Sequence, residues 1–425
     1  MSDHPGLALA PGAAGDLRVN GSRLLGRLDD LAAIGGSRDG GVTRMGFSPE
    51  DRQARAYVVQ EATAAGLRTR IDAGGNLLIR RPSGHRGVER PAVLVGSHLD
   101  TVAQGGRLDG AYGVIAALEV LQTLHEGGVA TGCEIIAIAF ANEEGALFPQ
   151  PFWGSMVLTG QLDALPSEPQ DSSGKPLRQA LELAGGDMAR LATAVWPPGS
   201  CTAYLELHVE QGPVLQRRGR RIGVVDSITG RTLLRVQMQG RAGHAGTTPM
   251  GGRQDPLVVA AQAVLAVKAL AGAEQLCRVA TVGWMDVRPN SPNTVPDVVR
   301  LDVDLRDSDH GRLAEAEEAL RRKLALLARR GDVQISVEAA VRTDPVPTDP
   351  RLRHAIEASA AELGLAHETL ASGAGHDAQI MAAITPVGMI FVPSIDGVSH
   401  VPSERTAPED LVAGAEVLLR TVLRV

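Results

Sequence analysis

Apolar and polar positions along the chain alternate with the periods of helices and strands, and together they predict an α/β fold. Helical spacing covers residues 23–34 and 49–65. Residues 67–71 and 76–80 are short alternating runs separated by Ala-Gly-Gly, a pattern typical of a hairpin. Further predicted elements are a buried strand from Pro91 to His98, a helix over 113–126 and strands over 134–141 and 222–227. Strands that alternate with helices indicate βαβ units, so we expect a mostly parallel central sheet flanked by helices.

The pattern changes near residue 228. We expect strands over 232–239, 278–287, 294–306 and 333–341 and helices over 256–271 and 313–330. This set predicts an inserted α+β domain, residues 228–338, with a four-stranded antiparallel sheet and two helices. A helix over 352–363, a strand over 387–392 and a helix over 408–423 then complete the first domain. The predicted division is a flexible tail (1–18), a catalytic domain (19–227 and 339–425) and the insert.

Composition narrows the class of protein. A chain of 425 residues with 44% hydrophobic residues fits two globular domains. The net charge of −7, scattered cations and 3% aromatic residues argue against a nucleic-acid surface. Cys133, Cys201 and Cys277 are far apart, so we expect no disulfide framework and a reducing compartment. The N-terminus lacks a signal-peptide pattern and no apolar stretch is long enough to span a bilayer, so we expect a cytoplasmic protein without membrane partners.

Chemically active side chains gather where two predicted strands end. His98 and Asp100 close the first strand, and a Gly-rich loop leads to Asp109 before the next helix. Glu143 and Glu144 follow the second strand. Open α/β sheets place their sites at this edge, and a mixed His/Asp/Glu set binds divalent metals that activate water. The sequence therefore predicts a metal-dependent hydrolase.

Each candidate also has an ordinary structural interpretation. Asp109 is placed to cap a helix, although a carboxylate there can also bridge two ions, which we favour. Asp100 is placed to hydrogen-bond the His98 imidazole rather than ligate directly. Of the adjacent acids, one can ligate while the other serves as general base. Taken alone, His208 would be interpreted as an exposed polar residue of a strand, and His400 as an ordinary loop residue.

Seven segments resemble the hydantoinase/carbamoylase family, the amidase branch of the dinuclear aminoacylase/carboxypeptidase-like metallohydrolases. These segments are GSHLDTV at 96–102, GRLDG at 106–110, NEEG at 142–145, ELHVEQGP at 206–213, GHAGTTPM at 243–250, SGAGHDA at 372–378 and GVSH at 397–400. The resemblance as a whole runs in order along the chain from about residue 20 to the C-terminus. Members include N-carbamoyl-L-amino-acid hydrolases, β-ureidopropionases and allantoate amidohydrolases.

The resemblance implies a site of two divalent ions. One ion would take His98, Asp109 and His208, and the other would take Asp109, Glu144 and His400, with Asp109 bridging. Glu143 would be the general base and Asp100 an orienting residue. Zn²⁺ is the ion expected first, and Mn²⁺, Co²⁺ and Ni²⁺ also suit such ligands.

The resemblance further implies substrate-binding residues and a lid. His244, Asn293 and Arg306 would bind substrate from the inserted domain, and His244 would also stabilise the oxyanion in catalysis. Gln211, Gly375 and His376 would contribute from the catalytic domain. The insert would act as a lid and as the contact of a homodimer.

The reaction expected is hydrolysis of the ureido C–N bond of N-carbamoyl-amino acids to the amino acid, ammonia and carbon dioxide. Allantoate and N-carbamoyl-β-alanine remain alternative substrates, because the signals conflict. Pro149–Ser155 and Thr247–Met250 resemble the allantoate branch, whereas Asn142 resembles the carbamoylase and ureidopropionase members. Leu147 also stands where the family commonly has Arg. A peptidase or deacetylase of the wider clan would lack the GAGHD and HVEQGP elements. A silent binding homologue would lack a ligand or Glu143, and all are present.

Overall fold

The chain forms two compact units in the computed structural model, which describes residues 17–82, 91–162 and 169–425. The first unit runs to Asp226 and also holds Thr348–Ser372 and His376–Val425. The second unit is Ser227–Pro347 with Gly373–Gly375. It extends past residue 338 because its last long strand continues to Thr343. Of the predicted flexible tail, residues 1–16 lie outside the described residues.

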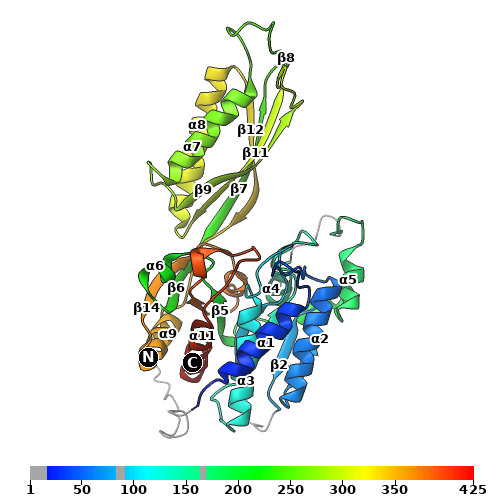
Figure 1. Ribbon diagram of the computed structural model, residues 1–425, viewed down its shortest axis with the longest axis vertical. Helices are drawn as coiled ribbons and strands as arrows, with labels where there is room; N and C mark the ends of the chain where they lie inside the picture. The colour runs from blue at the N-terminus through cyan, green and yellow to red at the C-terminus, as the bar shows by residue number, and fades with distance from the viewer. Residues whose placement is uncertain (1–16, 83–90, 163–168) are drawn as a thin grey trace. The chain divides into compact units, whose positions relative to one another are not determined.

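A nine-stranded sheet organises the first unit, in the order β1-β2-β4-β3-β5-β15-β6-β13 with β14 paired to β6 (Figure 1). The strands are β1 Arg68–Ile71, β2 Leu77–Arg80, β3 Ala92–His98, β4 Ile135–Phe140, β5 Cys201–Val209, β6 Ile222–Ile228, β13 Val346–Pro347, β14 His367–Ser372 and β15 Val387–Val392. The four central strands β4, β3, β5 and β15 are parallel. Their carboxyl ends therefore meet at one edge of the sheet. The outer pairs β1/β2, β2/β4, β15/β6 and β6/β13 are antiparallel.

Helices pack around this sheet because its central strands are apolar on both faces. Every residue of β3 and β4 is buried, the property that makes parallel strands continuous apolar runs. The helices are α1 Gly21–Ala33, α2 Pro49–Ala64, α3 Ala111–Glu126, α4 Trp153–Thr159, α5 Leu177–Leu183, α6 Val214–Arg218, α9 Pro350–Glu362, α10 Asp377–Met381 and α11 Pro408–Arg424. Two short 3₁₀ helices span Met188–Ala194 and Ile395–Gly397. The helices of five to seven residues (α4, α5, α6 and α10) escaped prediction because two turns or fewer show no clear period.

The second unit is an antiparallel sheet in the order β12-β7-β11-β9, with α7 and α8 side by side on one face (Figure 1). Its elements are β7 Gly230–Gln239, β8 Gly243–His244, α7 Pro256–Ala271, β9 Val279–Arg288, β10 Thr294–Val295, β11 Val298–Asp307, α8 His310–Gly331 and β12 Gln334–Thr343. Alternate β11 residues, such as Leu301 and Leu305, are buried beneath the helices. The predicted fold class, a parallel-dominated sheet with helices and a separate four-stranded antiparallel sheet, is confirmed.

One predicted strand, 294–306, is wrong as a single element. Pro296 has no N–H to donate and follows the two-residue β10, so the ladder breaks there and β11 begins at Val298. β10 pairs instead with β8, where Thr294 lies opposite His244. Across the described ranges, each helix is too short or too polar to cross a membrane.

Candidate metal centre

Four parallel strands deliver the predicted ligands to one edge of the first unit. His98 is the last residue of β3, and Glu143 and Glu144 follow β4. His208 lies in β5, and His400 is in the loop that follows β15. Asp109 enters from the loop before α3, whose N-cap Gly110 has φ +62°. A Cβ on Gly110 would overlap the His98 ring, so the close approach of this loop to His98 requires glycine.

Asp109 stands at the centre of the three histidines. Its Oδ1 atom lies 3.1 Å from His208 Nε2 and 3.6 Å from His98 Nε2. Its Oδ2 atom lies 3.1 Å from His400 Nε2, and His400 Nε2 is 3.4 Å from Glu144 Oε1. The two carboxylate oxygens therefore face different partners, the geometry that a bridging ligand needs.

The histidine rings are held in the tautomer that ligation requires. His98 Nδ1 is 2.9 Å from the carbonyl of Asp100, and His208 Nδ1 is 2.9 Å from its neighbour's carbonyl at Val209. Because a carbonyl only accepts, each Nδ1 carries the hydrogen. In the neutral ring, Nε2 is then the nitrogen without hydrogen on the side of Asp109 and is free to ligate, as in metal sites whose histidines donate their other ring N–H to a carbonyl.

Two groups of side chains meet the size requirement for an ion. In the described residues, His98–Asp109–His208 and Asp109–Glu144–His400 each offer ligand atoms within 4.8 Å of one another. Ligands at about 2.0–2.2 Å from Zn²⁺ lie roughly 3.3 Å apart in a tetrahedral site. The distances from Asp109 to its partners, 3.1–3.6 Å, fit this spacing. The donor set of nitrogen and carboxylate oxygen suits divalent ions of the first transition row.

The Asp100 carboxylate holds the segment of Glu143 and Glu144 rather than the His98 ring. Its carboxylate accepts the main-chain N–H groups of Glu143 and Glu144, both at 3.1 Å. The main-chain carbonyl of Asp100 accepts the hydrogen bond from His98 Nδ1, while Asp100 Oδ1 lies 3.8 Å from the same nitrogen. The predicted carboxylate–imidazole bond is thus replaced by a main-chain one, because the side chain turns to cap the end of β4.

Burial and mutual charge set the protonation of the site. Burial raises the pKa of Glu143 well above its usual value, and the Glu144 charge adds to this. Burial likewise raises the pKa of Glu144 to about 7. Burial opposes ionisation of Asp109, but its bonds to the histidines outweigh it and hold the pKa well below the usual range. The hydrogen bond to Asp109 raises the pKa of His400 to about 9.

Three residues at or next to the candidate metal centre have left-handed backbone conformations. Asn142 has φ +51°, Gln211 +56° and His400 +60°. Side-chain-bearing residues adopt this region at a cost of about 1–3 kcal/mol when not locally compensated, and such residues cluster at functional sites. Asn142, for example, donates its side-chain amide to the carbonyls of Phe148 and Gln150, which fixes the turn before Glu143.

Two predicted substrate residues of the first unit contact candidate metal ligands. Gln211 Nε2 donates to Asp109 Oδ2 at 2.7 Å. The His376 ring is buried and lies edge-on to His208, with 4.7 Å between centroids. Its Nε2 is 2.8 Å from Ser372 Oγ, and burial lowers its pKa well below the usual value, so the ring is neutral. The structure thus places His376 against a ligand. Gly375 lies in the short loop 373–375.

The other three predicted substrate residues belong to the second unit. His244 Nδ1 accepts the main-chain N–H groups of Gly246 and Thr247, so a neutral ring carries its proton on the exposed Nε2. Asn293 Oδ1 accepts the hydroxyl of Ser291, which leaves its amide N–H groups as donors. Arg306 forms a two-point contact with Asp304.

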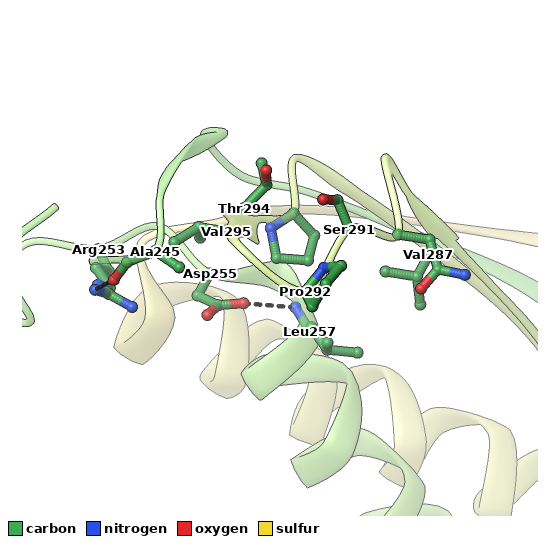
Figure 2. A pocket seen from close by; sticks show the side chains of 11 residues that line it. Ala245, Arg253, Asp255, Leu257, Val287, Ser291, Pro292, Thr294 and Val295 are labelled. Atoms are coloured by element: carbon green, nitrogen blue, oxygen red, sulfur yellow. Dashed lines mark hydrogen bonds between the residues drawn. The ribbon is translucent and has the colours of Figure 1, made fainter. Parts of the chain in front are cut away.

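A hollow of about 460 Å³ lies within the second unit (Figure 2). It is bounded by the loops that carry His244 and Asn293, through their chain neighbours Ala245 and Pro292. Asp255 at its base accepts the N–H of Leu257 and so caps α7. The hollow lies beside the predicted substrate residues but does not include their side chains.

Sequence reasoning missed four polar side chains around the candidate ligands, three of them buried and one, Ser399, half-buried. Ser399 and Glu404 bind the Asp109 loop. Glu206 accepts hydrogen bonds from Ser97 Oγ and from the main chain of Ala378, and burial raises its pKa together with that of Asp377. Only for Glu206 was there a signal, since it shares the inward face of β5 with His208.

Comparison with known proteins gives consistent matches over nearly the whole chain. The model of peptidase family M20/M25/M40 matches residues 94–424. An N-carbamoyl-L-amino acid amidohydrolase of Geobacillus stearothermophilus is 39% identical, covering 95% of this chain and 98% of the relative. An allantoate amidohydrolase of Bacillus subtilis is 36% identical, covering 91% and 93%. The crystal structure of an amidase of the hydantoinase/carbamoylase family from Burkholderia multivorans has a TM-score of 0.86 at 34% identity, covering 96% and 98%.

Proposed function

The chain belongs to peptidase family M20/M25/M40, and we propose that it is a metal-dependent amidohydrolase that cleaves the ureido C–N bond of N-carbamoyl-L-amino acids. The products are the amino acid, ammonia and carbon dioxide. The observation that carries this proposal is Asp109, whose two oxygens face two separate sets of ligands beside the buried Glu143. Relatives named as N-carbamoyl-L-amino-acid amidohydrolases support the substrate class.

Two divalent ions are proposed for the site, one held by His98, Asp109 and His208 and the other by Asp109, Glu144 and His400. When bound, such ions polarise a carbonyl and lower the pKa of a water molecule toward neutrality. We propose Zn²⁺ as the native ion, with Mn²⁺, Co²⁺ and Ni²⁺ as alternatives. A cytoplasmic location and a homodimer formed through the second unit, acting as a lid, also remain proposals.

Glu143 is the proposed general base. Asp100 holds its main-chain N–H, and burial raises its pKa, so the carboxylate both accepts a proton readily and can return it. It takes a proton from the attacking water at one Oε atom and passes it to the leaving nitrogen. His98 Nε2, 3.7 Å from Glu143 Oε2, helps to keep the side chain at the site.

Substrate binding is proposed for His244, Asn293, Arg306, Gln211, Gly375 and His376. The His244 Nε2–H and the Asn293 amide suit an oxygen that gains negative charge in the transition state. The planar guanidinium of Arg306 suits the substrate carboxylate. The neutral His376 ring lies edge-on to His208, with 4.7 Å between centroids, which places it next to the proposed metal group.

The substrate is tested by ammonia release from metal-reconstituted protein. N-carbamoyl-L-amino acids, N-carbamoyl-β-alanine and allantoate are offered side by side, and the highest kcat/KM is expected for the first. The allantoate amidohydrolase of Bacillus subtilis makes allantoate the second candidate. If metal-loaded protein turned over none of the three, a clan peptidase, a deacetylase or a silent homologue would replace this proposal.

The affinity of the ion at Asp109–Glu144–His400 is expected to rise with pH. His400 has a pKa of about 9 without metal, and its proton must leave before Nε2 can ligate. Because the ion must displace this proton, the apparent affinity is expected to fall roughly tenfold for each pH unit below about pH 9. Titration with Co²⁺ at several pH values measures this slope. In a His400→Ala variant the contribution disappears. A wild-type affinity that stays flat with pH would contradict the assigned ligand.

A further inference from the structure

One buried carboxylate, that of Glu404, joins two ligand-bearing loops. Its Oε1 atom accepts the main-chain N–H of Leu108 at 2.9 Å and that of Asp109 at 3.0 Å. Its Oε2 atom accepts the hydroxyl of Ser399, the residue before His400. A single side chain therefore ties the loop of Asp109 to the loop of His400.

The Asp109 loop is shaped around this carboxylate. Glu404 is 3% exposed, and a Cβ on Gly106 would overlap its carboxyl group. The main-chain N–H of Glu404 donates to the carbonyl of Val401 at 3.1 Å, which fixes the turn between His400 and Glu404. Because a buried carboxylate is costly unless its oxygens are hydrogen-bonded, its full set of partners indicates a defined role.

Ser399, which Glu404 holds, contacts only one of the two carboxylate oxygens of Asp109. Ser399 Oγ also lies 2.9 Å from Asp109 Oδ2, so its single hydroxyl hydrogen is shared between the carboxylates of Glu404 and Asp109. The same Oδ2 faces His400 Nε2 at 3.1 Å, whereas Oδ1 faces His208 and His98. The Glu404–Ser399 pair therefore restrains the half of Asp109 that belongs with Glu144 and His400.

We propose that Glu404, through Ser399, is a positioning residue that sets the affinity of the Asp109–Glu144–His400 group for its divalent ion. The His98–Asp109–His208 group depends on it far less. Residues that hold a ligand in place before the ion arrives typically contribute 10–100-fold in metal affinity. This inference rests on the proposed pair of ions.

The test is a Co²⁺ titration of the metal-free full chain, followed by visible absorption and by metal content. A His400→Ala variant identifies which binding step belongs to the Asp109–Glu144–His400 group. Glu404→Ala is expected to weaken that step by about 10–100-fold and the other step by less than about threefold. Ser399→Ala is expected to weaken the same step by a smaller factor.

A conservative variant and a matched control separate positioning from general damage. Glu404→Gln is expected to restore most of the affinity, because its carbonyl can accept the two main-chain N–H groups and its amide can donate to Ser399. Glu210 is a buried glutamate that likewise accepts two consecutive main-chain N–H groups, from Val214 at 2.7 Å and Leu215 at 2.9 Å. Glu210→Ala is expected to leave the His400-dependent step unchanged.

Several results would overturn the inference. It fails if Glu404→Ala leaves the His400-dependent step unchanged, weakens both steps equally, or matches Glu210→Ala. Where Glu404→Ala does not fold, by circular dichroism, an unchanged step in Ser399→Ala decides against it. A wild-type protein that binds no second Co²⁺ ion contradicts the proposed function itself. Two bound ions with unaffected variants overturn only the role of Glu404.

Discussion

Glu143→Gln is expected to lower kcat by about 10²–10⁴-fold while both metal ions remain bound. Glutamine has the size of glutamate but cannot take the proton of the attacking water. The main-chain bond from Glu143 N–H to Asp100 does not involve the side chain, so the local geometry is expected to persist. Steady-state kinetics with the preferred ureido substrate measures the loss, and metal content is measured on the same sample.

Glu210→Gln is the matched control, since Glu210 is also a buried glutamate that follows a parallel strand of the same sheet. It is expected to retain activity within a few-fold, because the Glu210 carboxylate accepts the main-chain N–H groups of Val214 and Leu215 at the start of α6. A Glu143→Gln enzyme with activity within tenfold of wild type would remove Glu143 from its proposed role. A Glu143→Gln enzyme that binds both ions but has lost turnover would show that Glu143 acts in proton transfer and does not ligate an ion.

Asp109→Ala is expected to abolish binding of both ions and, with them, activity. Its two oxygens serve both ligand groups, so one substitution removes a ligand from each. The ion pairs with His98, His208 and His400 also vanish, and the pKa values of these histidines are expected to fall. Metal content after reconstitution, with NMR titration of the histidines in the metal-free protein, measures both effects.

His400→Ala and Asp72→Asn are the comparison variants for the metal content of Asp109→Ala. The first removes a ligand from one group only, so one ion is expected to remain. Asp72 is a buried carboxylate in the β1–β2 turn that accepts two hydrogen bonds from Asn76, and Asp72→Asn is expected to bind two ions. If Asp109→Ala kept an ion at each group, the bridging role would be untenable.

Strong local patterns predicted the fold class well. The continuous apolar runs that became β3 and β4 are buried on both faces, and the strict alternation of β11 has one face beneath helices. A strand buried on both faces is apolar throughout, and a strand buried on one face alternates. Each pattern can therefore be recognised within the segment itself. Elements without such a pattern escaped prediction, among them α4 and α10, and the break at Pro296 was overlooked.

Pairings between distant residues were beyond sequence reasoning. Glu404 lies 296 positions after Leu108, yet its carboxylate holds that residue's N–H. The edge-on contact of the His376 ring with His208 joins residues 168 positions apart, and no local pattern in either segment indicates it. Asp100 was predicted to bond the His98 ring through its carboxylate, which instead caps the residues after β4.

The sequence by itself determined which types of side chain are available for chemistry and at which edge of the sheet they lie. Parallel strands end at one edge, so His, Asp and Glu residues at the ends of apolar runs must gather there. The tertiary structure alone decided which atoms face one another. Asp109 turns Oδ1 to His208 and Oδ2 to His400, and Glu404 and Ser399 hold that orientation. Such choices depend on side-chain rotamers and on loops brought together by folding, and no local period along the chain records them.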